Sequence, residues 1–347
     1  MENIFLKPGK WQKSNLKFKL ARSRNYLFVP VIFLTFMLIF FVSSCTKEKS
    51  FPEKIRLGYL QSDIHQLPAF VALEQGFFKS EGLNVEVAGV FPSGPEEMSA
   101  FASGDLDVGY VGISPFITAR ANGKIQAVAV AQCNAEGSAL VVAKKEPVSS
   151  VPDLKGKTVA IPGHATVQDI LLRRLFLNNK IDLKQVNIIV LKPPEMIGAL
   201  QTGQIDAFLA WEPYPSKAVG GQIGRVLTRS GQIWPGHPCC VLVVQEKLLK
   251  ERPQVVDALV RAHSKAIKFI REKPEEAIKI GQKYTGMDEE IIQNALSNVK
   301  YDYFPDSVAA EEYVNLIKNL GYISVQNEKQ FAQDMFYLKF VEQIKQN

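Results

Sequence analysis

The sequence predicts an α/β protein with two lobes, each built on a mainly parallel sheet with helices on both faces. One observation is an internal repeat, because FASGDLDVGYVGISPF at residues 101–116 is echoed by LQTGQIDAFLAWEPYP at residues 200–215. The other is that each copy closes a longer unit, in which near-continuous apolar runs alternate with helical patterns. This alternation is typical of β-α-β-α-β units with a parallel sheet, so we expect one unit in each lobe.

The first unit follows the order strand, helix, strand, helix, strand. The apolar runs and alternating segments predict the strands, and the helical patterns end at glycines. We expect these elements at 55–60, 67–82, 83–90, 94–104 and 106–112.

The second unit repeats this plan, with Thr166 as an N-cap candidate for its first helix. We expect its elements at 157–163, 165–179, 187–192, 193–203 and 205–211. The strands at 137–146 and 236–247 flank this unit and are candidates for a two-strand hinge.

The remaining chain is expected to be helical only and to pack back on the first lobe. These helices are expected at 253–274, 275–283, 288–298, 307–319 and 327–345. The predicted organisation is a first lobe made of 55–139 and 240–347, a second lobe at 140–239, and two N-terminal segments, at 1–44 and 45–54.

Residues 1–44 are predicted to be a signal peptide. They carry seven Lys and Arg residues against one Glu, a net charge of +6, and the whole chain also carries +6. Residues 45–347 are therefore neutral overall, so no basic tract remains for binding nucleic acid. A charge-free run, 26–42, then leads to VSSC, which resembles a bacterial lipoprotein box.

Cys45 would then be the acylated first residue of the mature protein, and 45–54 a polar tether to the membrane. The alternative is an uncleaved membrane anchor, since 17 apolar residues reach the lower end of the spanning range. Both interpretations place the body of the protein outside the cytoplasm.

Three further cysteines leave two alternatives open. An exported protein can form disulfides, so Cys133 could bond Cys239 or Cys240. Alternatively, all three are small apolar residues in buried strands. Adjacent cysteines rarely bridge each other.

No catalytic motif, cofactor fingerprint or metal-ligand spacing stands out in the sequence. Among the four histidines, His263 lies on the apolar face of a helix and is expected in the core. His237 precedes a hinge strand and is expected to be structural. His65 and His164 lie in strand-end loops, where a binding role and a surface role are equally open.

The expected ligand site lies beyond the carboxyl ends of the strands, as in other open parallel sheets. The five loops there are small and polar, and several lead into helix N-termini, which suit anions. None contains an arginine, so the clamp expected for a phosphate is missing. These loops are at 61–65, 91–94, 112–114, 163–166 and 211–214.

Trp211 and Glu212 lie at the end of the last strand of the second unit, next to the expected ligand site. Trp211 is expected either to wall the ligand or to pack between the lobes. Glu212 is expected to accept a capping or interlobe hydrogen bond rather than to contact the ligand directly.

Four stretches resemble the nitrate, aliphatic-sulfonate and taurine group of ABC-transporter substrate-binding proteins, whose fold thiamine-pyrimidine-precursor proteins share. The resemblance runs from about residue 54 to 300. The stretches are IRLGYLQSDIHQLPAFVALEQGFFKSEGLNVEV, ASGDLDVGYVGISP, DLKGKTVAIP and GQIDAFLAWEPY.

The resemblance implies a type II periplasmic-binding-protein-like fold that captures a small solute and delivers it to a membrane permease. We expect a monomer without cofactor or metal. The expected solute is a sulfonate, nitrate, taurine or a related molecule, and a neutral or aromatic ring stacked on Trp211 would fit as well. Carried over by position, the ligand-binding residues would be Gln61, His65, Ser93, Gly94, Gly112, Ser114, Gln132, His164, Ala165, Thr166, Trp211 and Glu212.

An enzyme on the same fold, of the pyrimidine-precursor or menaquinone-pathway type, is the alternative function. His65 and the Cys239–Cys240 pair would be its starting point. The export leader and the lack of a nucleophile positioned beside a base in the sequence count against it.

Overall fold

The computed structural model describes residues 53–346. The predicted signal peptide, Cys45 and most of the predicted tether lie outside the described residues. Among the described residues, no helix is both long enough and apolar enough to cross a membrane.

The first lobe is built on a six-stranded sheet with the order β11-β4-β10-β3-β1-β2. The strands β2, β1 and β3 are parallel, whereas β10 runs antiparallel between β3 and β4. The strands are β1 (Ile55–Leu60), β2 (Val85–Phe91), β3 (Val108–Gly112), β4 (Ala127–Glu136), β10 (Pro238–Gln245) and β11 (Val299–Tyr301).

The second lobe is built on a five-stranded sheet with the order β7-β6-β8-β5-β9. The strands β7, β6 and β8 are parallel, and β5 is antiparallel to both β8 and β9. The strands are β5 (Ser138–Ala143), β6 (Thr158–Ile161), β7 (Asn187–Val190), β8 (Ala207–Trp211) and β9 (Gly224–Arg229).

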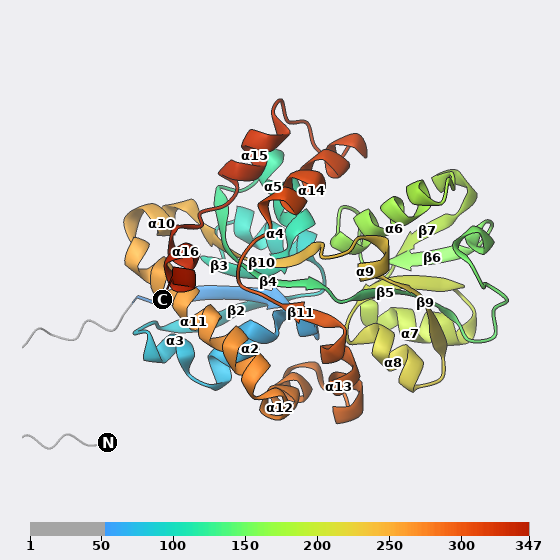
Figure 1. The fold of residues 1–347 in the computed structure, drawn as a ribbon, viewed down its shortest axis with the longest axis horizontal. Helices are drawn as coiled ribbons and strands as arrows, with labels where there is room; N and C mark the ends of the chain where they lie inside the picture. Colours follow the sequence, from blue (N-terminus) through green and yellow to red (C-terminus); the bar gives the residue numbers. More distant parts are fainter. Residues whose placement is uncertain (1–52, 347) are drawn as a thin grey trace, which may run out of the picture. The chain divides into compact units, whose positions relative to one another are not determined.

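Helices cover both sheets (Figure 1). Those of the first unit are η1 (Ile64–Gln66), α2 (Leu67–Glu74), α3 (Phe77–Ser80), α4 (Gly94–Ala102) and α5 (Ile113–Ala121). Those of the second are η2 (Val151–Leu154), α6 (Val167–Asn178), η3 (Leu183–Gln185), α7 (Pro193–Thr202), α8 (Tyr214–Gly220) and α9 (Ser230–Ile233).

The C-terminal helices pack back on the first lobe, as predicted. Helix α11 contacts α2 and α3, and α14 contacts α5. The segment contains α10 (Glu246–Glu251), α11 (Pro253–Glu272), α12 (Pro274–Thr285), α13 (Glu289–Ser297), α14 (Ser307–Asn319), α15 (Glu328–Asp334) and α16 (Lys339–Gln346).

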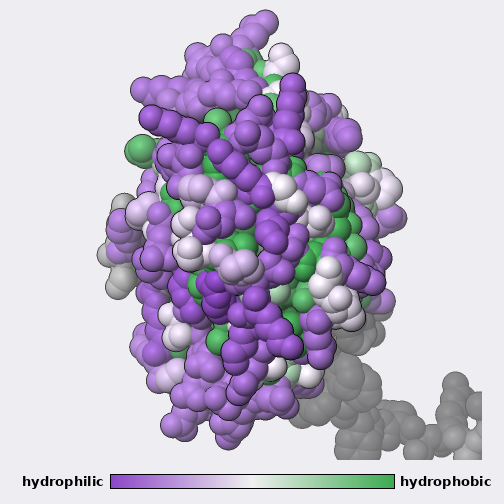
Figure 2. Space-filling model, turned by 90° about the vertical axis from the view of Figure 1, so that its right-hand side faces the viewer, coloured by the Kyte–Doolittle hydropathy of each residue, from purple (hydrophilic) through white to green (hydrophobic). Residues whose placement is uncertain are grey.

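The outward face of the second lobe is mainly hydrophilic, with apolar side chains only in small groups (Figure 2). The apolar strand residues are buried instead, and every residue of β8 and of β3 is buried. The near-continuous apolar runs in the sequence therefore reflect strands covered on both faces.

Three predicted elements differ from the structure. The helix expected at 67–82 is two helices, because Gly76 adopts a left-handed conformation, with φ 66°, between them. The segment expected to be helical only contains β11, which pairs with the edge of β4.

The helix expected at 327–345 is also interrupted. Ala129 of β4 donates its N–H to the Met335 carbonyl at 2.9 Å and accepts from the Tyr337 N–H at 2.9 Å. This short parallel bridge at the sheet edge replaces the helical hydrogen bonds there. Elements that the sequence did not suggest are also present, among them β4, β9, α5 and α8.

The chain passes between the two sheets twice. It crosses at Gly137, which joins β4 to β5 with φ 90°, and returns between α9 and β10. The predicted lobe boundaries, after 139 and after 239, stay predictions and lie close to these crossings.

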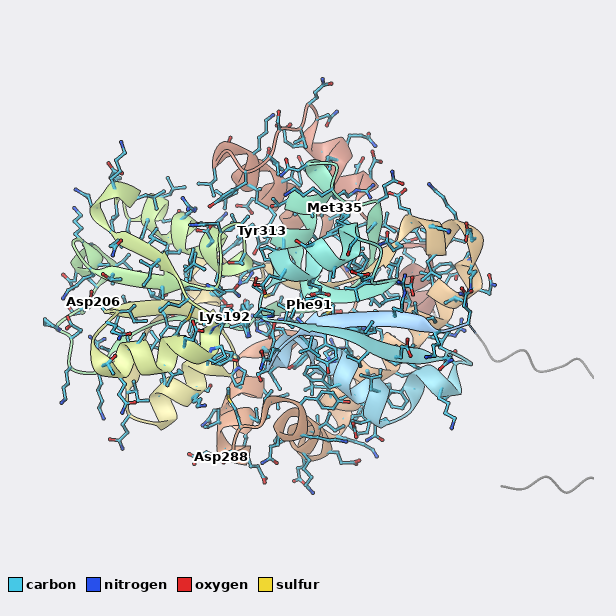
Figure 3. The ribbon with its side chains drawn as sticks, turned by 180° about the vertical axis from the view of Figure 1, so that it is seen from behind. Phe91, Lys192, Asp206, Asp288, Tyr313 and Met335 are labelled. Atoms are coloured by element: carbon cyan, nitrogen blue, oxygen red, sulfur yellow. The ribbon has the colours of Figure 1, made fainter. Side chains whose placement is uncertain are left out.

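The repeated Asp has the same structural role in both lobes. The Asp107 carboxylate accepts the Arg56 N–H at 2.8 Å, and the Asp206 carboxylate accepts the Thr158 N–H at 2.7 Å. Each Asp thereby ties the start of the last strand of its unit, β3 or β8, to the parallel neighbouring strand, β1 or β6. Figure 3 shows Asp206 at the outer end of the second sheet, and Lys192, just after β7, at the end that faces the first lobe.

Candidate functional site

A small cavity of about 20 Å³ lies between the lobes, at the carboxyl ends of the parallel strands. Residues from both lobes and from β10 enclose it. They are Leu60, Asp63, His65, Gly94, Gly112, Pro115, Thr166, Val167, Gln168, Trp211, Cys239 and Cys240. No lysine or arginine is among these described lining residues.

Two glycines of the first lobe let neighbouring groups come close at this cavity. A Cβ atom on Gly94 would lie 2.5 Å from the Pro115 ring, and a Cβ on Gly112 would lie 3.2 Å from Val167 of the second lobe. Because Gly94 and Gly112 lack side chains, their backbone atoms line the first-lobe side of the cavity and can be contacted by a bound molecule.

Trp211 forms the opposite wall. It ends β8, is 3% exposed, and packs edge-on against Tyr214 with 6.3 Å between ring centroids. Its indole Nε1 is buried and finds no hydrogen-bond partner in the described part of the chain. A buried donor without a partner is costly, so this N–H is available to an acceptor atom of a bound molecule.

His65, Cys239 and Cys240 meet on the third side of the cavity. The Cys239 Sγ lies 3.3 Å from His65 Nδ1, the Cys240 Sγ lies 4.0 Å from the same atom, and the two sulfur atoms are 4.0 Å apart. All three side chains are buried. The Asp63 carboxylate lies behind them, 3.6 Å from His65 Nδ1, and accepts the His65 backbone N–H at 2.9 Å.

This cluster shifts the pKa values of its members. Burial lowers the pKa of His65, but the Cys239 thiolate and the Asp63 carboxylate raise it more, to about 9. Burial raises the pKa of Cys239, but the hydrogen bond from Cys240 and the charge of His65 together hold it well below its ordinary value. Burial raises the pKa of Asp63 to about 6. The geometry thus favours a thiolate–imidazolium pair at the cavity wall.

Direct contacts hold the lobes together around the cavity. Ser114 donates its hydroxyl to the Ala165 carbonyl at 2.8 Å, and the Ile64 N–H donates to the Glu212 carbonyl at 3.2 Å. The Glu212 carboxylate accepts from the Ser216 N–H at 3.0 Å and from the Asn298 amide at 2.8 Å. These bonds are the capping and interlobe contacts expected of Glu212.

The structure brings together five of the twelve predicted site residues at the cavity, namely His65, Gly94, Gly112, Thr166 and Trp211. Ser114, Ala165 and Glu212 lie at the lobe contacts instead. Ser93 precedes α4 as its N-cap residue, and Gln132 is buried in β4. Gln61 and His164 are exposed and do not line the cavity. No ligand has tested this set, so its binding role stays a prediction.

Sequence reasoning did not place Asp63 and Gln168 among the binding residues, and it linked Cys239 and Cys240 to His65 only as the starting point of the enzyme alternative. Asp63 lies in the loop 61–65, which the sequence already placed at the expected ligand site, so its position in the chain could have identified it. The adjacent cysteines were themselves the signal that drew attention to β10, which is separated from the rest of the site in the chain.

The structure decides between the alternatives for the three described cysteines and shows the place of His263. Cys133, Cys239 and Cys240 are free and buried, so of the two alternatives the structure supports buried thiols in strands and not a disulfide. His263 is a core residue, as expected. It lies 3.2 Å from the Tyr110 hydroxyl and 2.7 Å from the Gln132 carbonyl, and burial lowers its pKa to about 4.

Comparisons with known proteins agree with this architecture. The taurine-binding periplasmic protein of Escherichia coli is 34% identical over 199 residues, which cover 56% of this chain and 60% of that protein. The alkanesulfonate-binding protein SsuA from Xanthomonas axonopodis pv. citri, bound to MOPS, superposes with a TM-score of 0.72 at 17% identity, over 83% of this chain and 99% of that one.

The periplasmic nitrate-binding protein NrtA from Synechocystis PCC 6803 superposes with a TM-score of 0.75, again at 17% identity, over 85% of this chain and 89% of that one. These structures confirm the predicted two-lobed, periplasmic-binding-protein-like fold. The relatives named here are binding proteins, which favours a binding function over the enzyme alternative. The model described as the NMT1-like family matches residues 48–282, and the chain therefore belongs to the NMT1-like family.

Proposed function

We propose that this protein is the solute-binding component of an ABC importer and that it encloses a small solute between its two lobes. The observation that carries the proposal is the cavity at the facing carboxyl ends of the two sheets, with the unpartnered indole N–H of Trp211 at its wall. A receptor of this kind needs a site that both lobes complete, and residues from both lobes line this cavity.

Closure of the lobes would trap the solute. The chain passes between the lobes only at Gly137 and between α9 and β10 in the described residues, which suits a hinge. The cavity of about 20 Å³ holds little more than one water molecule. A solute would therefore bind with the lobes further apart than they are here.

The solute is proposed to be a small sulfonate, nitrate, taurine or a related molecule. Its oxygen atoms would accept from Trp211 Nε1, and its body would contact the indole ring and the backbone at Gly112. No cationic side chain lines the cavity among the described residues, and the Asp63 carboxylate opposes a bare anion. Taurine is therefore the first probe, because its ammonium group could approach Asp63 while its sulfonate faces Trp211.

Calorimetric titration of taurine, ethanesulfonate, nitrate and a hydroxymethylpyrimidine tests the proposal. We expect taurine, ethanesulfonate or nitrate, and not the hydroxymethylpyrimidine, to bind with one-to-one stoichiometry, and solution scattering at saturation to report a changed radius of gyration. Failure of the whole panel to bind would contradict the assigned solute class. Binding without any change in the scattering profile would contradict lobe closure.

The same proposal places the receptor outside the cytoplasm, held near its permease by a lipid on Cys45, and acting as a monomer that does not bind nucleic acid. The near-neutral charge of 45–347 and the VSSC sequence support this. Metabolic lipid labelling of wild type and Cys45→Ala tests the anchor. We expect label on the wild type alone, and label that persists in the variant would exclude Cys45 as the acylation site.

A further inference from the structure

The His65–Cys239–Cys240 cluster has the dimensions of a metal site. Zinc bonds of about 2.3 Å to sulfur and about 2.0–2.1 Å to nitrogen in a tetrahedron place two sulfurs about 3.8 Å apart and a sulfur and a nitrogen about 3.6 Å apart. The corresponding distances here are 4.0 Å between the sulfurs and 3.3 and 4.0 Å from sulfur to His65 Nδ1. All three ligand atoms lie within 4.8 Å of one another.

An irregularity in β10 places both thiols on one side of the strand. Successive side chains of a regular strand point to opposite faces, which would separate Cys239 from Cys240. The pairing of β10 with β4 instead shifts register on both sides of Cys240. Such a bulge re-aims a side chain, and both sulfur atoms therefore reach the same imidazole.

The imidazole is held in the orientation that a ligand requires. His65 Nε2 lies 2.9 Å from the Gly137 carbonyl, to which it donates, so Nδ1 is the ring nitrogen that faces the sulfurs. A backbone carbonyl on the outer nitrogen is a common partner of metal-bound histidines. Gly137 must lack a side chain here, because a Cβ atom would lie 2.3 Å from His65 Nε2.

We propose that His65 Nδ1, Cys239 Sγ and Cys240 Sγ form a binding site for one thiophilic metal ion of the zinc(II) type. Two sulfurs and an imidazole nitrogen select such ions over magnesium or calcium, which prefer oxygen ligands. Three protein ligands leave a fourth position open. That position faces the cavity walled by Gly112 and Trp211, where water or a solute would complete the coordination.

Proton balance follows from the groups present. The metal-free cluster carries two protons that the bound state cannot keep, either on both thiols or on one thiol and the Nδ1 of His65. The ion takes their place, and about two protons are released for each zinc bound.

Zinc(II) titration of the full-length protein, kept reduced and purified in detergent, tests the site directly. A chromophoric chelator reports the affinity and the stoichiometry. We expect one tightly bound zinc per chain and release of about two protons. Cobalt(II) in place of zinc should give the sulfur-to-metal charge-transfer absorption of two thiolates in a tetrahedral field.

Matched variants separate this site from other thiols. Cys239→Ser and Cys240→Ser should each weaken zinc binding by at least about a hundredfold, since each removes a direct ligand. Cys133→Ser alters another buried thiol outside the trio and should leave the affinity unchanged.

Three results would overturn the proposal: no zinc binding by the reduced wild type, equal losses in all three variants, or a wild-type cobalt spectrum without thiolate charge transfer. The cobalt spectrum needs only the wild-type protein, so it remains decisive if a variant fails to fold. The site does not depend on the proposed solute, because metal binding is measured without taurine or any other organic ligand.

Discussion

Gly112 and Trp211 occupy corresponding positions at the ends of β3 and β8, the last strands of the two repeated units. The backbone arrangement around them is the same, with a parallel neighbour and a preceding Asp that fixes the register. The side chains are opposite extremes of size. The first lobe therefore exposes backbone to the cavity, while the second supplies a ring and a hydrogen-bond donor.

A second pair of positions shows the same principle inside the lobes. The Glu of a Glu-Met pair lies in the first turn of both α4 and α7, but Glu97 is buried, whereas Glu195 is exposed and accepts the Lys192 N–H at 3.3 Å. The neighbouring strand explains the difference. Gly109 on β3 leaves room for the Glu97 carboxyl, since a Cβ there would lie 2.6 Å from Glu97 Oε1, whereas the buried Phe208 occupies the matching place on β8.

In both pairs, the two repeated units share the backbone geometry and differ in the side chains at matching positions. A matched substitution in each lobe should therefore change stability or binding unequally where the side chains at the two positions differ. The changes should be similar where the side chains have the same role.

The largest effect is expected for Trp211→Ala compared with Gly112→Ala. Truncating a buried Trp should lower the free energy of unfolding by about 3 kcal/mol, and removing its cover should weaken solute binding roughly tenfold to a hundredfold. Gly112→Ala brings a Cβ atom to 3.2 Å from Val167 across the lobes, so it should affect closure more than melting. Thermal melting and calorimetric titration measure both. Equal losses of stability in the two variants would break the comparison, and unchanged affinity of Trp211→Ala would make the ring a packing element only.

The next effect is expected for Glu97→Gln compared with Glu195→Gln. Burial raises the pKa of the Glu97 carboxyl well above its ordinary value, and neither carboxyl oxygen has a partner among the described residues. The folded state thus keeps a proton that the unfolded chain loses above about pH 4.3. Its stabilising contribution is complete below that pH and is lost as the pH rises through the folded-state pKa.

Denaturant unfolding at pH 4 and pH 8 should therefore show Glu97→Gln gaining about 2 kcal/mol relative to wild type at the higher pH only. Glu195→Gln, on the surface of the other lobe, should stay within about 0.5 kcal/mol at both. A Glu97→Gln curve that follows the wild type at both pH values would contradict a raised pKa for the Glu97 carboxyl.

Smaller and more similar effects are expected for Asp107→Ala and Asp206→Ala. Each removes the acceptor of a backbone N–H and should lower the free energy of unfolding by about 1–2 kcal/mol. Asp107 should cost slightly more, because Arg56 binds it through both Nε at 3.1 Å and a terminal nitrogen at 2.8 Å, whereas Lys157 lies 3.4 Å from Asp206. Chemical unfolding of both variants measures this. A loss confined to one lobe would show that the repeated Asp does not have a shared role.

The smallest effect is expected for Thr166→Ala compared with Ser93→Ala, two N-cap residues on opposite lobes. The Thr166 hydroxyl accepts the Asp169 N–H at 3.3 Å, whereas the Ser93 side chain makes no capping bond. Removing the Thr166 cap should cost about 1 kcal/mol, and Ser93→Ala should stay within about 0.5 kcal/mol. Unfolding curves that reverse this order would contradict the capping assignment.

The sequence by itself determined the repeated unit and most of its elements. Long apolar runs bounded by turns mark strands covered on both faces, and β1 begins and ends at the predicted residues. Local signals were equally dependable. Thr166 is an N-cap, and His263, which lies on an apolar helix face, is buried with two partners. These features depend on neighbours within a few residues, so the local pattern contains their cause.

Elements that depend on distant partners were less visible. The three-residue β11 forms because the edge of β4 offers it hydrogen bonds, and the same edge interrupts the helical pattern at 335–337. A strand that exists through its partner leaves little trace in its own sequence.

The site was decided by tertiary structure in the same way. His65 and Cys239 are 174 residues apart, and they meet only because β10 inserts between β3 and β4 at the carboxyl end of β1. The irregularity around Cys240 then turns both sulfurs toward one ring. Chain spacing cannot encode such a meeting, because the positions of three side chains in space depend on how separate strands pair and not on the number of residues between them.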